Sequence, residues 1–231
     1  MLIERGPGRP KRYELDGKEV PSVTTIISRF KRSDKLMDWA WRQGLQGKNW
    51  RTTRDRAAGG GSDVHNAIEM DIHGEQWQPN PHNTDQTDKV YRALEAFRQW
   101  KQEEGLVWVA TELPMVSAKH KFGGTMDGML RNGDYCQVFD IKTSKSVYED
   151  HILQLGAYSL LWEEVKKLPV NGGLILRVHG GSDDGEEVPC TKPTWFDQQA
   201  IAMAAHTFLL MLQLYHMVEK LERLAKKANK P

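Results

Sequence analysis

Three charged residues near the middle of the chain have types and spacing that could hold a metal ion. Asp140 and Lys142 lie two residues apart in QVFDIKTSK, which contains an apolar run typical of a β-strand. Asp127 lies upstream in GGTMDGML, and Asn132-Gly133 between the two runs predicts a hairpin with a two-residue type I′ turn. This turn pairs Asp127 with Val138. Asp140 then shares the face of Asp127 on a diagonal, with Cα atoms about 7–8 Å apart.

Two carboxylates and an ammonium group on one face allow two interpretations. Aspartate oxygens suit Mg²⁺ or Mn²⁺, and a lysine beside them could orient or deprotonate an attacking water while stabilising charge on a phosphate. The alternative is a surface ion pair between Asp140 and Lys142, which is the commoner explanation of an isolated D-x-K sequence. The other motifs in the chain decide between the two.

Periodic patterns predict the elements that must position these residues. Residues 1–11 are rich in Gly, Pro and Arg and are expected to be irregular. The predicted strands are 107–116, 123–130, 135–144 and 172–180. The predicted helices are 20–30, 35–45, 62–74 after a glycine break with Ser62 or Asp63 as cap, 83–105, 149–168, and 194–228 with Thr194 as cap. This order predicts an α/β fold with a mixed central sheet flanked by helices.

Charge divides the chain into two parts although the net charge is only +1. Residues 1–56 hold 14 Lys and Arg against 7 Asp and Glu, which leaves 18 against 24 for residues 57–231. We expect one domain over residues 1–231, with a basic, mostly helical part at 1–56 and the core and a long last helix at 57–231. A polyanion partner for the first part and cations for the second would explain this asymmetry; a solvated charged surface is the alternative.

Cysteine content and hydropathy indicate a cytoplasmic protein. Cys136 and Cys190 cannot form a disulfide framework, and no basic-then-apolar leader opens the sequence. Residues 200–218 carry no full charge, but two histidines, a threonine and a glutamine interrupt them. We therefore expect a core helix there, and not a membrane span.

Four motifs resemble a known family when they are taken in order. GGTMDGML, VFDIKTSK and QLGAYSLL are similar to the PD-(D/E)XK nuclease superfamily in its RecB-type branch, and GSDVHNAIE matches the G-x-x-x-H element of that branch. The opening PSVTTII and LMDWAWRQG resemble standalone phage and mitochondrial genome-maintenance exonucleases. The resemblance covers residues 21–161. It implies a restriction-endonuclease-like core with added N-terminal helices, in the cytoplasm of a bacterial or phage-infected cell.

The resemblance also implies roles for individual residues. Asp127 and Asp140 become the metal carboxylates, with His65 and the backbone carbonyl of Ile141 as further ligands. Lys142 becomes the catalytic lysine.

Further residues are assigned to supporting roles. Gln154 and Tyr158 match the Q-x-x-x-Y helix of the family and project from one helical face, where they would support the site or hold DNA. Glu112 is expected as an outer carboxylate. Glu69 is expected to hydrogen-bond the His65 imidazole, or else to face solvent.

Basic and hydroxyl side chains of the N-terminal part are the candidates for DNA binding. Ser22 and Thr24 fall where relatives touch phosphate, although helix capping explains them equally well. Trp39, Trp41 and Trp50 would stack on bases or belong to the core. The basic candidates are Arg29, Lys31, Arg32, Arg42, Arg51 and Arg54.

Taken together, the sequence predicts a metal-dependent DNA exonuclease that acts on single-stranded or free DNA ends in recombination, repair or replication. Its cofactor would be Mg²⁺ or Mn²⁺. Two cysteines exclude the four-cysteine iron–sulfur cluster of some relatives, and no P-loop is present, so no helicase motor is expected. A single-strand-binding or recombination protein is an expected partner, and a membrane is not. The alternatives are a nicking or structure-specific endonuclease and a catalytically inactive DNA-binding module.

Overall fold

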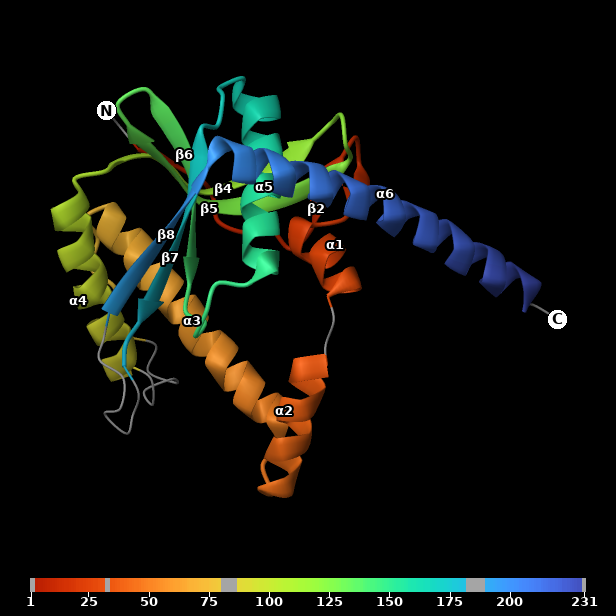
Figure 1. Ribbon diagram of the computed structural model, residues 1–231, viewed down its shortest axis with the longest axis horizontal. Coiled ribbons are helices and arrows are strands. Elements are labelled where there is room, and N and C mark those ends of the chain that lie inside the picture. The colour runs from red at the N-terminus through yellow and green to blue at the C-terminus, as the bar shows by residue number, and fades with distance from the viewer. Residues whose placement is uncertain (1–2, 32–33, 80–86, 182–189, 230–231) are drawn as a thin grey trace.

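A six-stranded mixed sheet forms the centre of the computed structural model, which describes residues 3–31, 34–79, 87–181 and 190–229 (Figure 1). The strand order is β1-β4-β5-β6-β7-β8. Only the β1–β4 and β6–β7 pairs are parallel; the others are antiparallel. The strands are β1 (Glu4–Arg5), β4 (Val107–Ser117), β5 (Phe122–Asn132), β6 (Tyr135–Lys142), β7 (Gly172–His179) and β8 (Cys190–Asp197), and a separate hairpin consists of β2 (Tyr13–Leu15) and β3 (Lys18–Val20).

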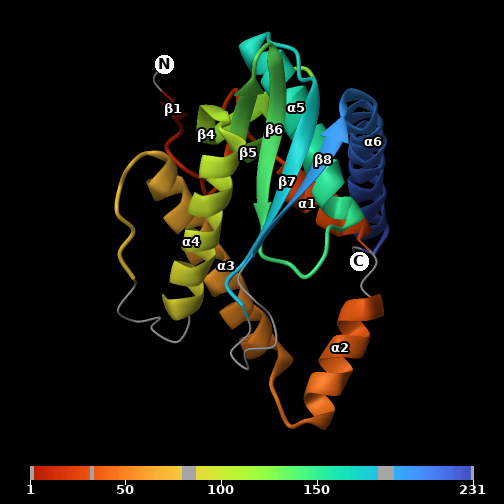
Figure 2. The same cartoon turned by 60° about the vertical axis from the view of Figure 1, so that its left-hand side comes forward.

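Helices cover both faces of this sheet (Figure 2). On one face lie α1 (Val23–Phe30), α5 (Glu149–Lys166) and α6 (Gln198–Ala228); on the other lie α3 (Trp50–Ile72) and α4 (Thr87–Glu104). Helix α2 (Asp34–Leu45) projects from the body between α1 and α3 and contacts α3. The predicted α/β class with a mixed sheet is confirmed, and the layering is that of the restriction-endonuclease-like fold.

Alternation along β6 explains why the sheet has a core on each side. Val138 packs in the cluster under α5, whereas Phe139 points to the α3–α4 side, where its ring meets Trp108 edge-on at 4.8 Å between centroids. Successive strand residues point to opposite faces. Asp140 and Lys142 therefore lie on the α5 side with Val138, as the sequence predicts.

The hairpin between β5 and β6 has a different register from the predicted one. Asn132 pairs with Tyr135, and Gly133 is the first loop residue, with φ of 59°. The predicted type I′ turn centred on Asn132-Gly133 is therefore wrong. A glycine at the first of two loop positions is typical of a type II′ turn. The pairing moves by two residues, so Met129 lies opposite Val138. An even shift keeps every side chain on its face. The paired stretch ends at Gly128 and Phe139, and one more step in the same register sets Asp127 opposite Asp140.

The predicted break at the glycines before His65 is also wrong. Helix α3 runs without interruption from Trp50, and Asn49 caps it by accepting a hydrogen bond from Arg51 N. Gly59, Gly60 and Gly61 lie inside the helix, where a Cβ added at Gly61 would sit 3.0 Å from Thr143 Oγ1. The glycine thus lets α3 pass close to the end of β6. Ser62 and Asp63 are ordinary residues of this helix and not its cap.

Two further boundaries differ from the sequence-based expectation, and a third is not described. Part of the N-terminal stretch expected to be irregular forms β1, which pairs with β4. Thr194 lies in β8, which pairs with β7, and Asp197 caps α6 by accepting a hydrogen bond from Ala200 N at 2.8 Å. Residues 83–86 of the predicted helix lie outside the described residues.

Helix α6 combines a packed first half with an exposed second half. Ile201, Phe208 and Leu212 are buried against the core, whereas residues 220–229 are exposed throughout. By length and composition alone it could cross a membrane, with a mean hydropathy of 1.4 in its most apolar window, 28% of which is buried. Packing of its first half agrees with the expectation of a core helix; the second half is considered below.

Candidate active site

Two buried carboxylates lie side by side where β5 and β6 run next to each other. Asp127 is 8% exposed and Asp140 is 1% exposed. Asp127 Oδ2 accepts a hydrogen bond from Ile141 N at 3.0 Å, which locks it onto the neighbouring strand. Lys142 Nζ lies 2.6 Å from Asp140 Oδ2. The structure therefore brings together all three residues that the sequence singled out.

Lys142 is the charged partner of the buried Asp140 carboxylate. The Asp140 Oδ2 atom is fully buried, and the Lys142 ammonium group lies 2.6 Å from it. Burial raises the pKa of Asp140, and the charge of Lys142 opposes that rise. A buried ionised carboxylate costs several kcal/mol unless positive charge surrounds it. The site thus fits a cation, since a second positive charge would stabilise both aspartates.

His65 of α3 and Glu112 of β4 complete this cluster. His65 Nδ1 lies 3.4 Å from Asp127 Oδ2. One ligand atom each from His65, Glu112 and Asp127 lies within 4.8 Å of the others, which is a spacing that a metal ion can bridge. Desolvation lowers the pKa of His65, so its imidazole is neutral at pH 7 and can donate a lone pair to a metal.

Glu112 has an unusual backbone conformation. Its φ is 45°, in the left-handed region that non-glycine residues rarely adopt. The β4–β5 register places it across from Asp127. Gly6, which follows β1, donates from its N to Thr111 O at 2.9 Å, and a Cβ there would lie 2.0 Å from Glu112 O. Backbone strain of this kind gathers at functional sites, and here the N-terminal segment holds it in place.

The environment of Glu112 changes its protonation. Burial, Asp127 and Glu69 together raise the pKa of Glu112 to about 7, against a smaller opposing effect of Arg9. Glu112 is consequently an acid that loses its proton near neutral pH, or as soon as a cation binds beside it.

Helix α5 places two further side chains against the aspartates. Gln154 Oε1 accepts a hydrogen bond from Lys142 Nζ at 2.9 Å, and Tyr158 is buried one turn later. A Cβ at Gly124 would lie 2.8 Å from Tyr158 Cε1, so glycine at this position of β5 makes room for the ring. Burial lowers the pKa of Lys142, but the negative charges of Asp140 and Asp127 have the larger combined effect and raise it. The Lys142 side chain is therefore protonated, and Asp140 and Gln154 hold it in place.

The predicted support of His65 by Glu69 is wrong. Glu69 Oε1 instead accepts a hydrogen bond from Arg5 Nε at 2.8 Å, and Arg5 also binds Glu75 at 2.5 Å. The N-terminal strand, which the sequence left unassigned, supplies this arginine. Glu69 thus ties β1 to α3 near the site.

Several predicted DNA-binding residues already have protein partners. Ser22 caps α1 and accepts a hydrogen bond from Thr25 N. Arg29 forms an ion pair with Glu222, and Lys31 lies 2.6 Å from Asp150. Thr24 hydrogen-bonds Ser22, and Arg42 donates to Asp38 O. The guanidinium groups of Arg51 and Arg54 lie over the Trp50 ring. Arg32 lies outside the described residues.

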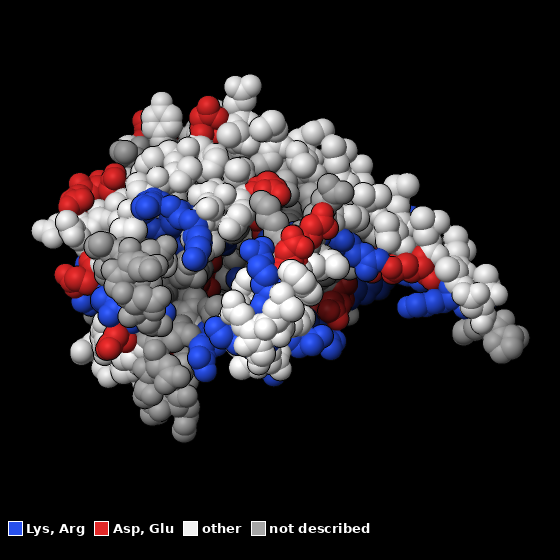
Figure 3. Space-filling view, turned by 60° about the horizontal axis from the view of Figure 1, so that its bottom comes forward, with Lys and Arg blue, Asp and Glu red and all other residues white. Residues whose placement is uncertain are grey.

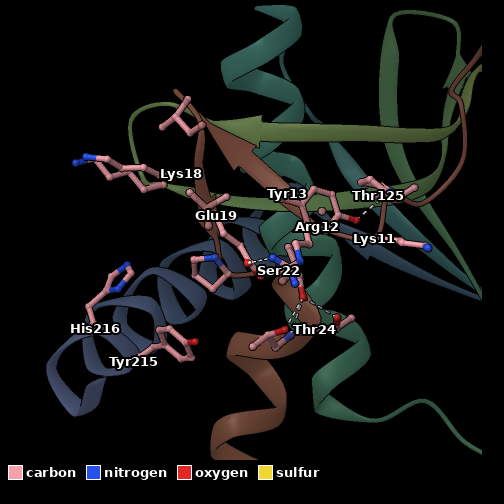
Figure 4. A pocket seen from close by; sticks show the side chains of 18 of the residues that line it. Lys11, Arg12, Tyr13, Lys18, Glu19, Ser22, Thr24, Thr125, Tyr215 and His216 are labelled. Atoms are coloured by element: carbon pink, nitrogen blue, oxygen red, sulfur yellow. Dashed lines mark hydrogen bonds and ion pairs between the residues drawn. The ribbon is translucent and has the colours of Figure 1, made fainter. Parts of the chain in front are cut away.

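A basic groove next to the carboxylates was not predicted. It has a volume of about 770 Å³ and lies between the β2–β3 hairpin, the start of α1 and the middle of α6 (Figure 4). Tyr158 belongs to both the groove and the site. Arg9 also lines the groove and lies near Asp127 and Tyr158; despite partial desolvation, these acidic groups raise its pKa. The other basic lining residues are Lys11, Arg12, Lys18, Lys121 and Arg223. A basic hairpin next to a strand carries little sequence signal, because only the fold brings it to the site.

Comparison with known proteins identifies the family. The family model described as "PD-(D/E)XK nuclease superfamily" matches residues 37–226. The search of curated proteins found no match.

Solved structures give weaker similarities. LHK-Exo in complex with dAMP is 16% identical over 72% of this chain and 93% of its own, with a TM-score of 0.36. The alkaline exonuclease LHK-Exo from Laribacter hongkongensis is 17% identical over 71% of this chain and 84% of its own, with a TM-score of 0.34. SSO0001 is 14% identical over 64% of this chain and 84% of its own, with a TM-score of 0.28. These scores are too low for an argument about activity.

We predict that metal binding strengthens as pH rises from about 6 to about 8. The folded-state pKa of Glu112 lies above its ordinary value, so the folded protein holds this proton below about pH 7 and releases it above. Metal ions bind only the carboxylate form, so affinity should rise by up to about tenfold per pH unit for each proton released. In metal-free protein the same shift has the opposite effect: stability falls as pH rises through 7.

Calorimetric titration with Mn²⁺ at several pH values measures this dependence. Glu112→Gln should give a shallower pH dependence, because one of the titrating carboxyls is gone. Glu95→Gln is the matched control, since Glu95 is 77% exposed on α4 and should leave the slope unchanged. An affinity that does not vary with pH in the unaltered protein would contradict the account.

Proposed function

Because the chain belongs to the PD-(D/E)XK nuclease superfamily, we propose that it hydrolyses phosphodiester bonds of DNA as an exonuclease with Mg²⁺ or Mn²⁺ as its cofactor. The observation that carries this proposal is the buried pair of carboxylates, Asp127 and Asp140, with the Lys142 ammonium group 2.6 Å from Asp140 Oδ2. A carboxylate pair with an adjacent fixed cation is suited to binding a metal and a phosphate together.

Five groups are the proposed metal ligands. Asp127 and Asp140 come from paired strands, His65 comes from α3, Glu112 comes from β4, and the fifth is the backbone carbonyl of Ile141. Oxygen-rich sets with one imidazole suit Mg²⁺ and Mn²⁺. When bound, the cation would polarise the scissile phosphate and lower the pKa of the attacking water.

Lys142 acts as a fixed positive charge in this mechanism. Its raised pKa keeps it protonated, so it stabilises the negative charge that develops on the phosphate and does not serve as a base. Gln154 Oε1 accepts a hydrogen bond from Lys142 Nζ at 2.9 Å and so fixes the direction of the ammonium group. Tyr158 lines the groove next to the site and excludes water from the aspartates beneath it.

The substrate strand is proposed to pass between α1 and α3, beneath α2. We call residues 23–72 the α1–α3 arch, since α1 contacts α5, α3 contacts α4, and α2 bridges them away from the sheet. Figure 3 views the face at the bottom of Figure 1, where Lys and Arg side chains lie around a hollow. Trp41 is 67% exposed on α2 and can stack on a base. An arch of this kind favours single-stranded DNA with a free end.

The basic groove continues this path on the other side of Tyr158. Arg9, Lys11 and Lys121 line it, and cations along a groove follow a phosphate backbone. A strand that enters beneath the arch would cross the metal site and leave along the groove. Recombination, repair and replication are the processes that supply such ends.

We predict that Lys142→Ala abolishes cleavage but leaves metal affinity within about threefold of the unaltered protein. The ammonium group is needed for charge that develops only in the transition state, and the metal ligands remain. Single-turnover cleavage of end-labelled single-stranded DNA and Mn²⁺ calorimetry measure the two effects separately.

Lys145→Ala is the matched control for this experiment. Lys145 lies three residues after the end of β6, with an exposed side chain. It should retain the cleavage rate. Equal loss of activity at both lysines would replace the specific role of Lys142 with a general effect of positive charge.

The distinction between exonuclease and endonuclease has its own test. Linear single-stranded DNA should be degraded progressively from an end, whereas covalently closed single-stranded circles of the same sequence should survive, because a closed circle has no end to pass beneath the arch. Gel analysis of both substrates with Mg²⁺ measures this. Efficient cutting of the circles by the pure protein would exclude threading and favour an endonuclease.

A further inference from the structure

Beyond Arg223, which lines the basic groove, the end of α6 extends from the body into solvent (Figure 1). Residues 220–228 are all helical and all exposed. An isolated helix of this length is marginal in water unless its apolar side packs against something. The exposed end of α6 therefore has no partner on which its apolar side packs, among the residues that the structure describes.

An apolar stripe runs along the exposed side of α6. Its members are each between 47% and 68% exposed, and we call them the α6 seam: Met203, Leu210, Leu214, Met217, Leu221 and Leu224. They follow one another at intervals of seven, four, three, four and three residues. This is the a/d spacing of a heptad repeat, which keeps one seam facing a partner helix. A helix packed on a single protein core needs no such 3.5-residue period.

The seam is distinct from the two faces of α6 that already have roles. Ile201, Phe208 and Leu212 face the core, and Tyr215 and His216 line the basic groove. On a helical wheel the groove-lining positions lie opposite the seam. A partner on the seam would thus leave the groove and the metal site open.

We propose that the α6 seam is a self-association surface, on which α6 of a second copy of this chain packs antiparallel. A two-fold axis between Tyr215 and His216 places Leu210 of one copy opposite Leu221 of the other, and Leu214 opposite Met217. The exposed end of each helix then covers the exposed stripe on the body-anchored half of the other. Such an isologous pair satisfies both halves of the seam at once.

Charge supports this arrangement. Residues 200–218 carry no full charge, so the end of the partner helix, with Lys220, Lys226 and Lys227, meets no fixed positive charge along the stretch that it covers. A parallel pair would instead bring the two globular bodies together at one end, because the first half of each α6 is packed into its own body.

The area of the seam is sufficient for a stable pair. Six long apolar side chains with about half or more of their surface exposed present on the order of 600 Å² per chain. Two copies would thus bury at most about 1,200 Å², at the lower end of specific interfaces, which begin near 1,000 Å². Single exposed apolar residues are common, but a contiguous stripe of this size is typical of an interaction site.

Sedimentation equilibrium of the full chain tests the proposal. The unaltered protein should have twice the mass of one chain at tens of micromolar. Met217→Glu with Leu221→Glu should weaken association at least about tenfold, because two charges enter an apolar seam. Leu168→Glu is the matched control, since Leu168 is 48% exposed outside α6, and it should leave the mass unchanged. Leu214→Ala with Leu221→Ala should also weaken association while it preserves helix content, which circular dichroism measures.

Cysteine cross-linking tests the direction of the helices, with Cys136 and Cys190 replaced by serine. Leu210→Cys with Leu221→Cys should link two copies under oxidation, whereas Leu224→Cys alone should not, because the antiparallel pair places the two copies of residue 224 about 25 Å apart along the axis. Efficient linking by Leu224→Cys alone would indicate parallel helices and overturn the antiparallel pair.

Other outcomes would overturn the seam as a self-association surface. One is a single-chain mass for the unaltered protein at these concentrations. Another is a single-chain mass in a protein that binds vesicles of anionic and neutral phospholipid. If the seam substitutions abolished that binding, the stripe would serve a membrane surface.

Discussion

The burial of the Asp140 carboxylate beside that of Asp127 is the constraint on which the rest of the site depends. Two ionised oxygens in a dry position repel each other and cost several kcal/mol in lost hydration. The chain compensates in part with Lys142 at 2.6 Å and with the Ile141 amide on Asp127. One ammonium group does not balance the charge of two buried carboxylates, and a divalent cation would complete that balance.

Distant segments keep this pair and its neighbours in place. Gly61 lets α3 approach Thr143 at the end of β6, which brings His65 to Asp127. The N-terminal segment packs Gly6 against the strained Glu112, and Arg5 binds Glu69 of α3. Residues far away in sequence thus hold the Asp127–Asp140 pair in place, while the basic arch and groove surround it. This distribution explains why the charges of the chain divide so unevenly between its two parts.

The sequence predicted the mixed sheet and the common face of Asp127, Asp140 and Lys142, because alternation along a strand is a local property. It did not predict their exact pairing, since Gly133 took the first position of the turn and moved the register by two residues. The strained φ of Glu112, the Arg5–Glu69 pair and the Arg9 groove depend on the short strand β1 and the β2–β3 hairpin. Elements of two or three residues leave too weak a pattern to detect, and only packing defines them.

Anomalous diffraction from crystals of the full chain soaked in Mn²⁺ tests the central claim most directly. The account predicts a peak within bonding distance of carboxylate oxygens of both Asp127 and Asp140, with His65 on the same ion. It also predicts that the peak disappears in Asp140→Asn crystals whose backbone is unchanged. A strong manganese peak elsewhere, with the two aspartates bound only to protein groups and water, would contradict the metal centre and with it the proposed chemistry.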